Sequence, residues 1–131
     1  MSVHVQWHDQ GQRIVYYEFQ GTILWEDYVA ALSQGRVMMQ SVPHQVCVLN
    51  AMLTDVHLPE GFVTKVRTIL ETEPENRGCI VFISPSQAFI QMMDKVQRII
   101  PNFDEYCFYA DTEAEALNCI RDWNNLQART S

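Results

Sequence analysis

The sequence predicts an α/β fold: a single mixed β-sheet of about five strands and about four helices. Short runs of β-branched and aromatic residues recur along the chain, and stretches with apolar residues at helical spacing separate most of them. The first two extended runs follow one another without a helix, which predicts an antiparallel hairpin at the N-terminus. Because helices separate the later strands, we expect the inner strands to run parallel through right-handed crossovers.

The hairpin and the first helix are predicted by a change of period. Residues 3–7 and 14–19 alternate apolar and polar side chains, and the segment between them has turn chemistry. Helical spacing follows, and we expect a helix over about residues 25–40. Glu26 and Asp27 would lie in its first turn, where carboxylates interact favourably with the positive end of the helix dipole.

The middle of the chain alternates strand and helix. Residues 45–50 form a short apolar run that is typical of an interior strand. Apolar residues then recur at helical spacing from Gly61, and this helix should end before Pro74. Residues 79–83 are the most hydrophobic run of the chain, so we expect them to form the central strand.

Two capping boxes mark the starts of the last two helices. Ser84 with Gln87, and Thr112 with Glu115, have the spacing at which a hydroxyl and a longer polar side chain satisfy free backbone groups at a helix start. Between these helices, residues 106–109 are expected to form the final strand.

Length and composition indicate one domain over residues 1–131. The chain is 47% hydrophobic and 19% charged, which is ordinary for a globular protein. Its apolar runs are far shorter than the roughly 20 residues that a membrane-spanning helix needs. The N-terminal residues also lack the basic and apolar regions of a secretory signal. We therefore expect no membrane insertion and a cytoplasmic location.

The charge of the chain argues against two classes of partner. The formal net charge is -7, and the nine Lys and Arg residues are scattered along the sequence. Such a surface repels the phosphates of nucleic acids and the head groups of anionic lipids. We expect neither to be a partner.

Five segments resemble a known domain family. They are residues 14–21, 25–27, 46–50, 58–61 and 108–117. Together they resemble the STAS-like group, the sulfate transporter and anti-sigma-factor antagonist domains, and within it the SpoIIAA-like members of bacteria. The resemblance covers nearly the whole chain. It implies a STAS fold and a non-enzymatic protein-interaction or regulatory module, with a protein partner or self-association as a homodimer.

The chain departs from that family at one functional segment. Where anti-sigma-factor antagonists have Asp-Ser-Ser-Gly with a phosphorylated serine, this chain has Leu58, Pro59, Glu60 and Gly61. The hydroxyl that a kinase would modify is missing. Glu60 supplies one negative charge, whereas a phosphate carries nearly two charges and three acceptor oxygens. We interpret Glu60 as a glutamate at a helix start, with a phosphate mimic as the alternative.

Polar residues after the first interior strand form the candidate binding site. Ligands of open α/β sheets bind beyond the carboxyl ends of the parallel strands. The residues expected there are Asn50, Thr54, Asp55, His57 and Glu60. Asp55, His57 and Glu60 have the residue types of a metal site, but their spacing matches no ligand signature, so no metal is expected. A solvated loop histidine is the preferred interpretation of His57, and recognition through hydrogen bonds is the alternative.

Methionine pairs and aromatic residues suggest a contact surface. In Met38-Met39 and Met92-Met93, one residue of each pair should enter the core while its neighbour lies nearer the helix edge, and methionine makes adaptable interfaces. The alternative is ordinary filling of the core. The candidate interface residues are Trp25, Tyr28, Met92 and Met93.

Two functional hypotheses follow. The sequence has no nucleophile elbow and no glycine-rich nucleotide loop, so we expect no catalytic site and no cofactor. The preferred hypothesis is a non-enzymatic module that binds a protein partner or itself near the helix that starts at Gly61. The alternative is a small-molecule-binding domain, or a weak enzyme, that uses a cleft near Asn50, Asp55 and His57.

Overall fold

The computed structural model describes residues 2–130, which form strands, helices and one short 3₁₀ turn. The strands are β1 (Val3–Trp7), β2 (Ile14–Phe19), β3 (Val46–Met52), β4 (Arg77–Ile83) and β5 (Cys107–Ala110). The helices are α1 (Trp25–Gln40), α2 (Phe62–Glu71), α3 (Gln87–Ile99) and α4 (Glu113–Thr130), and the 3₁₀ turn is η1 (Phe103–Glu105).

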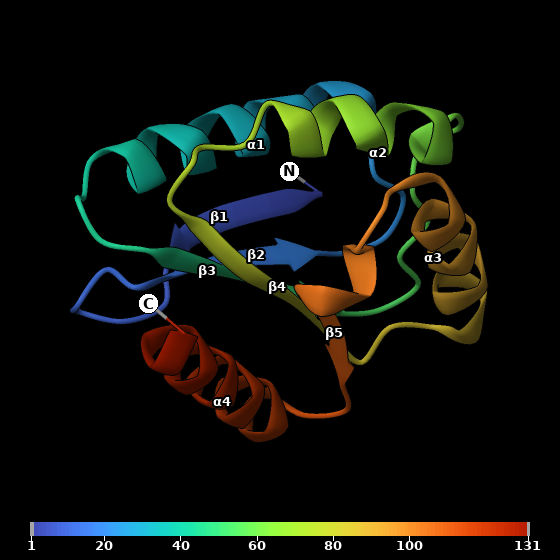
Figure 1. Ribbon diagram of the computed structural model, residues 1–131. Coiled ribbons are helices and arrows are strands. Elements are labelled where there is room, and N and C mark those ends of the chain that lie inside the picture. Colours follow the sequence, from blue (N-terminus) through green and yellow to red (C-terminus); the bar gives the residue numbers. More distant parts are fainter. Residues whose placement is uncertain (1, 131) are drawn as a thin grey trace.

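The strands form one mixed sheet in the order β1-β2-β3-β4-β5 (Figure 1). β1 pairs with β2 in antiparallel fashion, and the remaining neighbours are parallel. The predicted α/β class, the N-terminal hairpin and the parallel inner strands are therefore confirmed. This topology matches that of the STAS-like fold.

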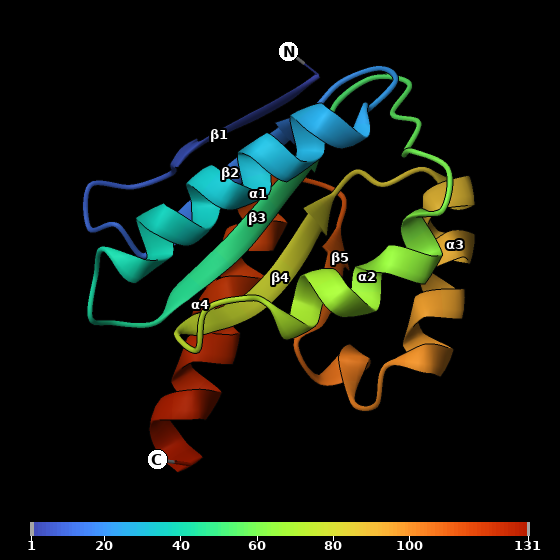
Figure 2. The same cartoon turned by 90° about the horizontal axis from the view of Figure 1, so that it is seen from above.

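The helices cover the two faces of the sheet unequally. α1, α2 and α3 pack on one face, and α4 lies alone on the other (Figures 1 and 2). β3 alternates between these layers: Val48 and Met52 belong to the three-helix core, whereas Cys47, Leu49 and Ala51 contact the α4 layer. β3 is therefore covered on both sides.

The prediction of the central strand is wrong, because the neighbouring strand lies at the centre of the sheet. The sequence analysis placed residues 79–83 at the centre, but the middle strand of the order is β3. All seven residues of β3 are buried, while β4 has half-buried residues at Arg77 and Phe82. The hydrophobicity of a strand usually indicates how deeply it is buried. β3 is fully buried but is interrupted by one polar residue, Asn50, so the run at residues 79–83 looks more central in the sequence.

The start of α3 also differs from the prediction. Ser86, rather than Ser84, caps the helix, and its hydroxyl accepts a hydrogen bond from the backbone N–H of Phe89 at 3.1 Å. Ser84 has a left-handed backbone, with φ 53°, and its hydroxyl donates to the carbonyl of Asp111 at 2.7 Å. The hydroxyl that the sequence assigns to a cap instead joins the ends of β4 and β5.

The predicted cap of α4 is confirmed. The Thr112 hydroxyl accepts from the backbone N–H of Glu115 at 3.1 Å, and the Glu115 carboxylate accepts from the N–H of Asp111 at 3.1 Å. Both side chains of the box therefore bind backbone donors at the helix start.

Helices α2 and α3 are amphipathic. α2 buries Phe62 and Val66, and α3 buries Phe89, Met93 and Val96, while exposed residues occupy their outer sides. Within residues 2–130, no helix has both the length and the apolar character that crossing a membrane would need.

Gly35 allows α1 to lie directly on β2. It is buried, and a Cβ atom at this position would overlap the hydroxyl oxygen of Tyr17 and lie 2.8 Å from its Cζ. Tyr17 is itself buried on the inner face of β2. The ring of Tyr17 and the missing side chain of Gly35 thus set the distance between helix and sheet.

We predict that Gly35→Ala lowers the free energy of unfolding by about 1–3 kcal/mol, because the added methyl group overpacks the contact with Tyr17. This loss should exceed the stabilisation of about 1 kcal/mol that alanine normally brings to a helix interior. Urea denaturation measures it. Gly11→Ala, in the exposed hairpin turn, is the control and should have little effect. Equal stability of G35A and the wild type would contradict the contact.

Candidate functional site

The loop after β3 is tied to the loop after β2. The backbone N–H of Gly21 donates to the carbonyl of Thr54 at 3.0 Å, and the N–H of His57 donates to the carbonyl of Gly21 at 3.0 Å. The N–H of Ile23 donates to the carbonyl of His57 at 2.8 Å. These bonds extend the pairing of β2 and β3 beyond the strands and fix the loop against the start of α1.

The predicted polar residues do not form one cleft. Thr54, Asp55, His57 and Glu60 are exposed on this loop, and Asp55 has a left-handed backbone with φ 47°. Asn50 instead points into the interior beneath α1 and α2, where it lines a cavity that neither Asp55 nor His57 reaches. Within the described chain, no group of three acidic, His or Cys side chains is placed to hold a metal ion.

Trp25 and Tyr28 join the starts of α1 and α2. Both rings pack against Phe62, with centroids 6.4 and 5.8 Å away, and the indole N–H of Trp25 donates to the carbonyl of Glu60 at 3.0 Å. The Lys65 ammonium lies 4.4 Å from the centre of the Trp25 ring. These contacts hold the first turn of α2 in place.

The segment from Leu58 to Gly61 leads into α2 without a side-chain cap. Gly61 is the N-cap residue, with φ 80° and ψ 9°, and no side chain accepts a hydrogen bond from the first turn there. Because this left-handed conformation favours glycine, the backbone geometry accounts for Gly61. Glu60 is exposed beside it.

The two methionines of α3 occupy different environments. Met92 is half-buried, whereas Met93 is only 2% exposed and lines the interior cavity. The same division holds in α1, where Met39 is buried and Met38 is half-buried. Met93 therefore belongs to the core, and in this structure it does not lie on a surface that a partner could contact.

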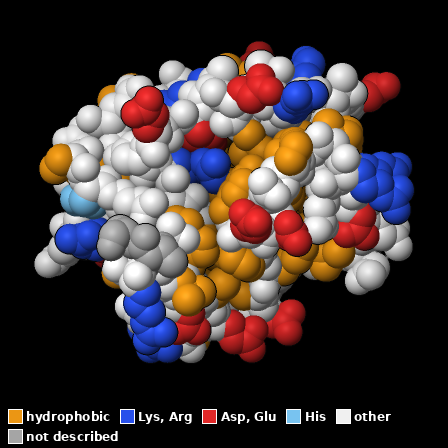
Figure 3. All heavy atoms as spheres, in the orientation of Figure 1, with side chains coloured by type: hydrophobic (Ala, Val, Ile, Leu, Met, Phe, Trp, Pro, Cys, Tyr) orange, Lys and Arg blue, Asp and Glu red, His pale blue; other side chains and the backbone are white. Residues whose placement is uncertain are grey.

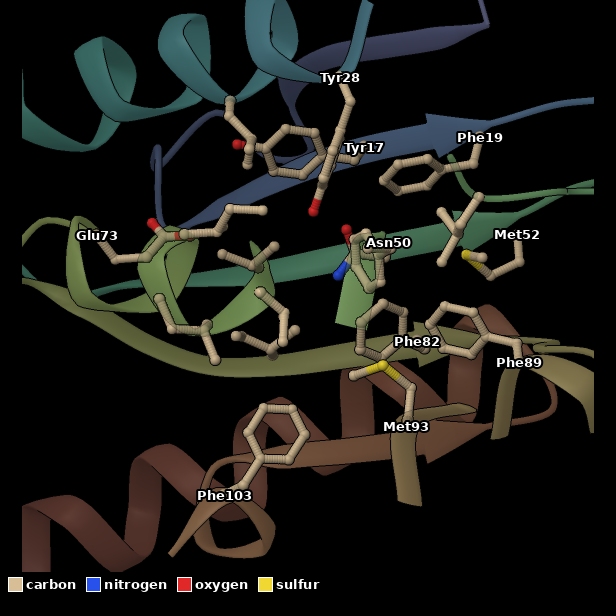
Figure 4. A pocket seen from close by; sticks show the side chains of 18 residues that line it. Tyr17, Phe19, Tyr28, Asn50, Met52, Glu73, Phe82, Phe89, Met93 and Phe103 are labelled. Atoms are coloured by element: carbon tan, nitrogen blue, oxygen red, sulfur yellow. The ribbon is translucent and has the colours of Figure 1, made fainter. Parts of the chain in front are cut away.

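An interior cavity lies between the sheet and the helices of the three-helix face (Figure 4). It offers about 60 Å³ to the centres of water-sized groups. Its lining is mainly apolar and rich in aromatic rings. The lining residues are Tyr17, Phe19, Tyr28, Leu32, Val48, Asn50, Met52, Leu58, Phe62, Val66, Ile69, Leu70, Glu73, Ile80, Phe82, Phe89, Met93 and Phe103.

Asn50 is the polar centre of this lining. It is 7% exposed and is the only buried polar residue of the described core. Its side chain makes no hydrogen bond with residues 2–130. Figure 4 shows its amide pointing into the cavity, with the hydroxyl of Tyr28 directed into the same space from α1. The Asn50 amide and the Tyr28 phenol therefore face the same apolar cavity.

Burial sets the protonation of the other polar lining groups. Burial raises the pKa of Tyr28 and of Tyr17, and the nearby Glu73 carboxylate raises both further. Both phenols therefore keep their protons at neutral pH and can donate hydrogen bonds. Burial also raises the pKa of Glu73, while the positive charges of Arg77 and Arg36 oppose this shift.

A groove between α1 and α2 lies next to the cavity. It has about 540 Å³ and is lined by Trp25, Val29, Leu32, Arg36, Lys65, Thr68, Ile69 and Thr72. Leu32 and Ile69 line the groove and the cavity alike. These two side chains therefore separate the interior from the surface.

A second apolar region is visible on the surface between α2, α3 and η1 (Figure 3). A hollow of about 200 Å³ in this region includes Leu70, Ile100 and Tyr106, together with the cations Arg67 and Arg77. Leu70 also lines the cavity from α2.

A comparison with protein-family models finds no match for this chain, and a comparison with curated proteins finds none either. The likeness to the STAS-like group therefore remains one of topology.

Sequence reasoning found Asn50 but missed Tyr17, Arg36 and Glu73. For Tyr17 a signal was present, because it lies between Val15 and Phe19 on the inward face of an alternating strand, where its hydroxyl has no access to bulk water. Arg36 and Glu73 carry no comparable signal in the sequence, since charged residues in and after helices are usually solvated.

The raised pKa of Glu73 predicts a pH-dependent stability. The folded state holds this proton more tightly than the unfolded state, whose carboxyl titrates near 4.5. Its contribution to stability is therefore fully present below that pH and is lost as the pH rises through the folded pKa. Glu73→Gln should remove this loss and leave the protein more stable than the wild type at pH 7. Urea denaturation from pH 4 to 8 measures the effect.

The matched control is Glu75→Gln, which changes an exposed carboxylate two residues away. It should follow the wild-type pH profile. If E73Q and E75Q had the same profile, burial of Glu73 would not be the cause.

Proposed function

We propose that this domain is a non-enzymatic, regulatory binding module that takes a small, mainly apolar molecule with a hydrogen-bonding group into its interior cavity. The observation that carries the proposal is Asn50, a residue only 7% exposed whose side-chain amide faces an apolar chamber (Figure 4). Small-molecule sites combine such an apolar lining with a few convergent polar groups.

The Asn50 amide is an unfavourable choice for stability alone. An amide gains less than an aliphatic side chain from apolar surroundings, so an apolar residue at this position would serve folding alone at least as well. A ligand with a carbonyl or hydroxyl group could pair with the Asn50 amide and with the Tyr28 phenol. Function, rather than stability, then explains the polarity of the site.

The proposal is non-enzymatic because of the kinds of group that line the cavity. Its polar members are two tyrosines with raised pKa values, one amide and one carboxyl. Raised phenol pKa values favour hydrogen-bond donation over nucleophilic attack. This chemistry suits recognition of a ligand rather than its turnover.

Methionine methyl groups provide the test of cavity binding. Met52 and Met93 line the cavity, whereas Met38 and Met92 do not. With ¹³C-labelled methionine methyl groups, titration with butan-1-ol should shift the Met52 and Met93 signals in a saturable way. The Met38 and Met92 signals should stay in place. Uniform shifts, or none up to the solubility limit, would rule out this use of the cavity.

Asn50→Leu separates binding from folding. It should weaken butan-1-ol binding while the free energy of unfolding stays the same or rises by up to about 1–3 kcal/mol, because an unpaired buried amide is removed. Asn118→Leu, on exposed α4 surface, is the matched control and should bind as the wild type does. Unchanged binding by N50L would contradict the role of the amide.

Self-association is a second candidate function, favoured by the outer surface of α1. Val29 and Val37 lie two helical turns apart and are 57% and 65% exposed. Exposed apolar side chains in register on one helix fit a second copy of this chain, paired through α1.

Light scattering at increasing concentration tests the pairing. The wild type should approach the mass of a dimer, and Val37→Glu should shift it toward the monomer, because a carboxylate would be buried in the contact. Ile99→Glu, at a 45% exposed position of α3, is the control that should not alter the mass. A wild type that stays at 15.2 kDa at all concentrations would exclude this function.

A further inference from the structure

We infer that the ligand of this site is an amphipathic anion, with a short apolar end in the cavity and a carboxylate held by Arg36 and Lys65 in the groove between α1 and α2. This inference rests on the proposed cavity binding and names the chemical class of its ligand.

Groove and cavity are neighbours that two side chains separate. Leu32 from α1 and Ile69 from α2 line both spaces, so movement of these two side chains would join them. The cavity offers only about 60 Å³ to the centres of water-sized groups. The groove is far larger, at about 540 Å³. A longer molecule can thus insert only its apolar end.

The charges of the groove indicate that the exposed end of the ligand is an anion. The ionisable side chains among its lining residues are Arg36 and Lys65, accompanied by the hydroxyl groups of Thr68 and Thr72. No carboxylate belongs to this lining. In a chain with a net charge of -7, two cations beside an apolar groove are complementary to an anion.

Arg36 also has an unused donor. One terminal guanidinium nitrogen donates to the hydroxyl of Thr72, which fixes the head group at the groove. Its Nε atom is buried and has no acceptor within residues 2–130. A carboxylate is the acceptor that matches a guanidinium best, since it can accept two parallel hydrogen bonds. Lys65, placed over the Trp25 ring, adds a second positive charge.

Glu73 is the charged group that opposes an anion. It lines the cavity, and its charge interacts with Arg36 and Arg77. In its ionised form Glu73 repels an anion held beside Arg36, and glutamine lacks this charge. Glu73→Gln should therefore bind an anionic ligand more tightly than the wild type does, whereas its affinity for a neutral ligand should change little.

Hexanoate and hexan-1-ol form a matched pair of probes, because they share an alkyl chain and differ in charge. Met52 and Met93 methyl signals report both titrations. Hexanoate should bind the wild type about tenfold more tightly, the factor that a charge-assisted hydrogen bond supplies. Arg36→Gln should remove this preference and keep hexan-1-ol binding. Arg98→Gln, on exposed α3 surface, should keep the preference.

The outcomes separate the two proposals. If hexan-1-ol and hexanoate bind the wild type equally, or if R36Q keeps the preference, the anionic class is wrong while cavity binding stands. If hexylammonium binds more tightly than hexanoate, the anionic class is also wrong. If none of the probes shifts Met52 or Met93, the cavity binding proposed above fails, and this inference fails with it.

Discussion

The rest of the structure depends on the complete burial of β3. This strand is paired with β2 and β4 at its two edges, and helices cover both of its faces. Any polar side chain in it therefore loses water on folding and must find another partner. Asn50 is the residue to which this constraint applies, and the chamber around it is built from the aromatic and aliphatic side chains of β2, β4 and the three covering helices.

The roof of the chamber follows from how α1 and α2 meet the sheet. Gly35 lets α1 lie on Tyr17 near its C-terminal end, while Trp25, Tyr28 and Phe62 join the two helices at their N-terminal ends. Between these contacts a groove separates the helices, and Leu32 and Ile69 form its base. Interior and surface are thus divided by two aliphatic side chains rather than by a packed helix pair.

Local patterns predicted the fold well because each element carries its own signal. Alternation marked β1 and β2, and the box of Thr112 with Glu115 marked α4. Ser84 misled, because its hydroxyl has two backbone targets and only the tertiary structure selects Asp111. The binding site was less predictable for the same reason. Asn50 stood out in an apolar run, but Tyr17 and Glu73, which line the same cavity, come from segments that only packing brings together.

The unequal distribution of the helices leaves two separate clusters of buried residues on opposite faces of the sheet. The core under α4, built around Leu49, Val81 and Ile120, shares no residue with the core that contains the chamber. Changes on the α4 side can therefore adjust folding stability while the chamber keeps its shape. Selection acting on this domain could tune its lifetime in the cell and the choice of its ligand through separate sets of residues.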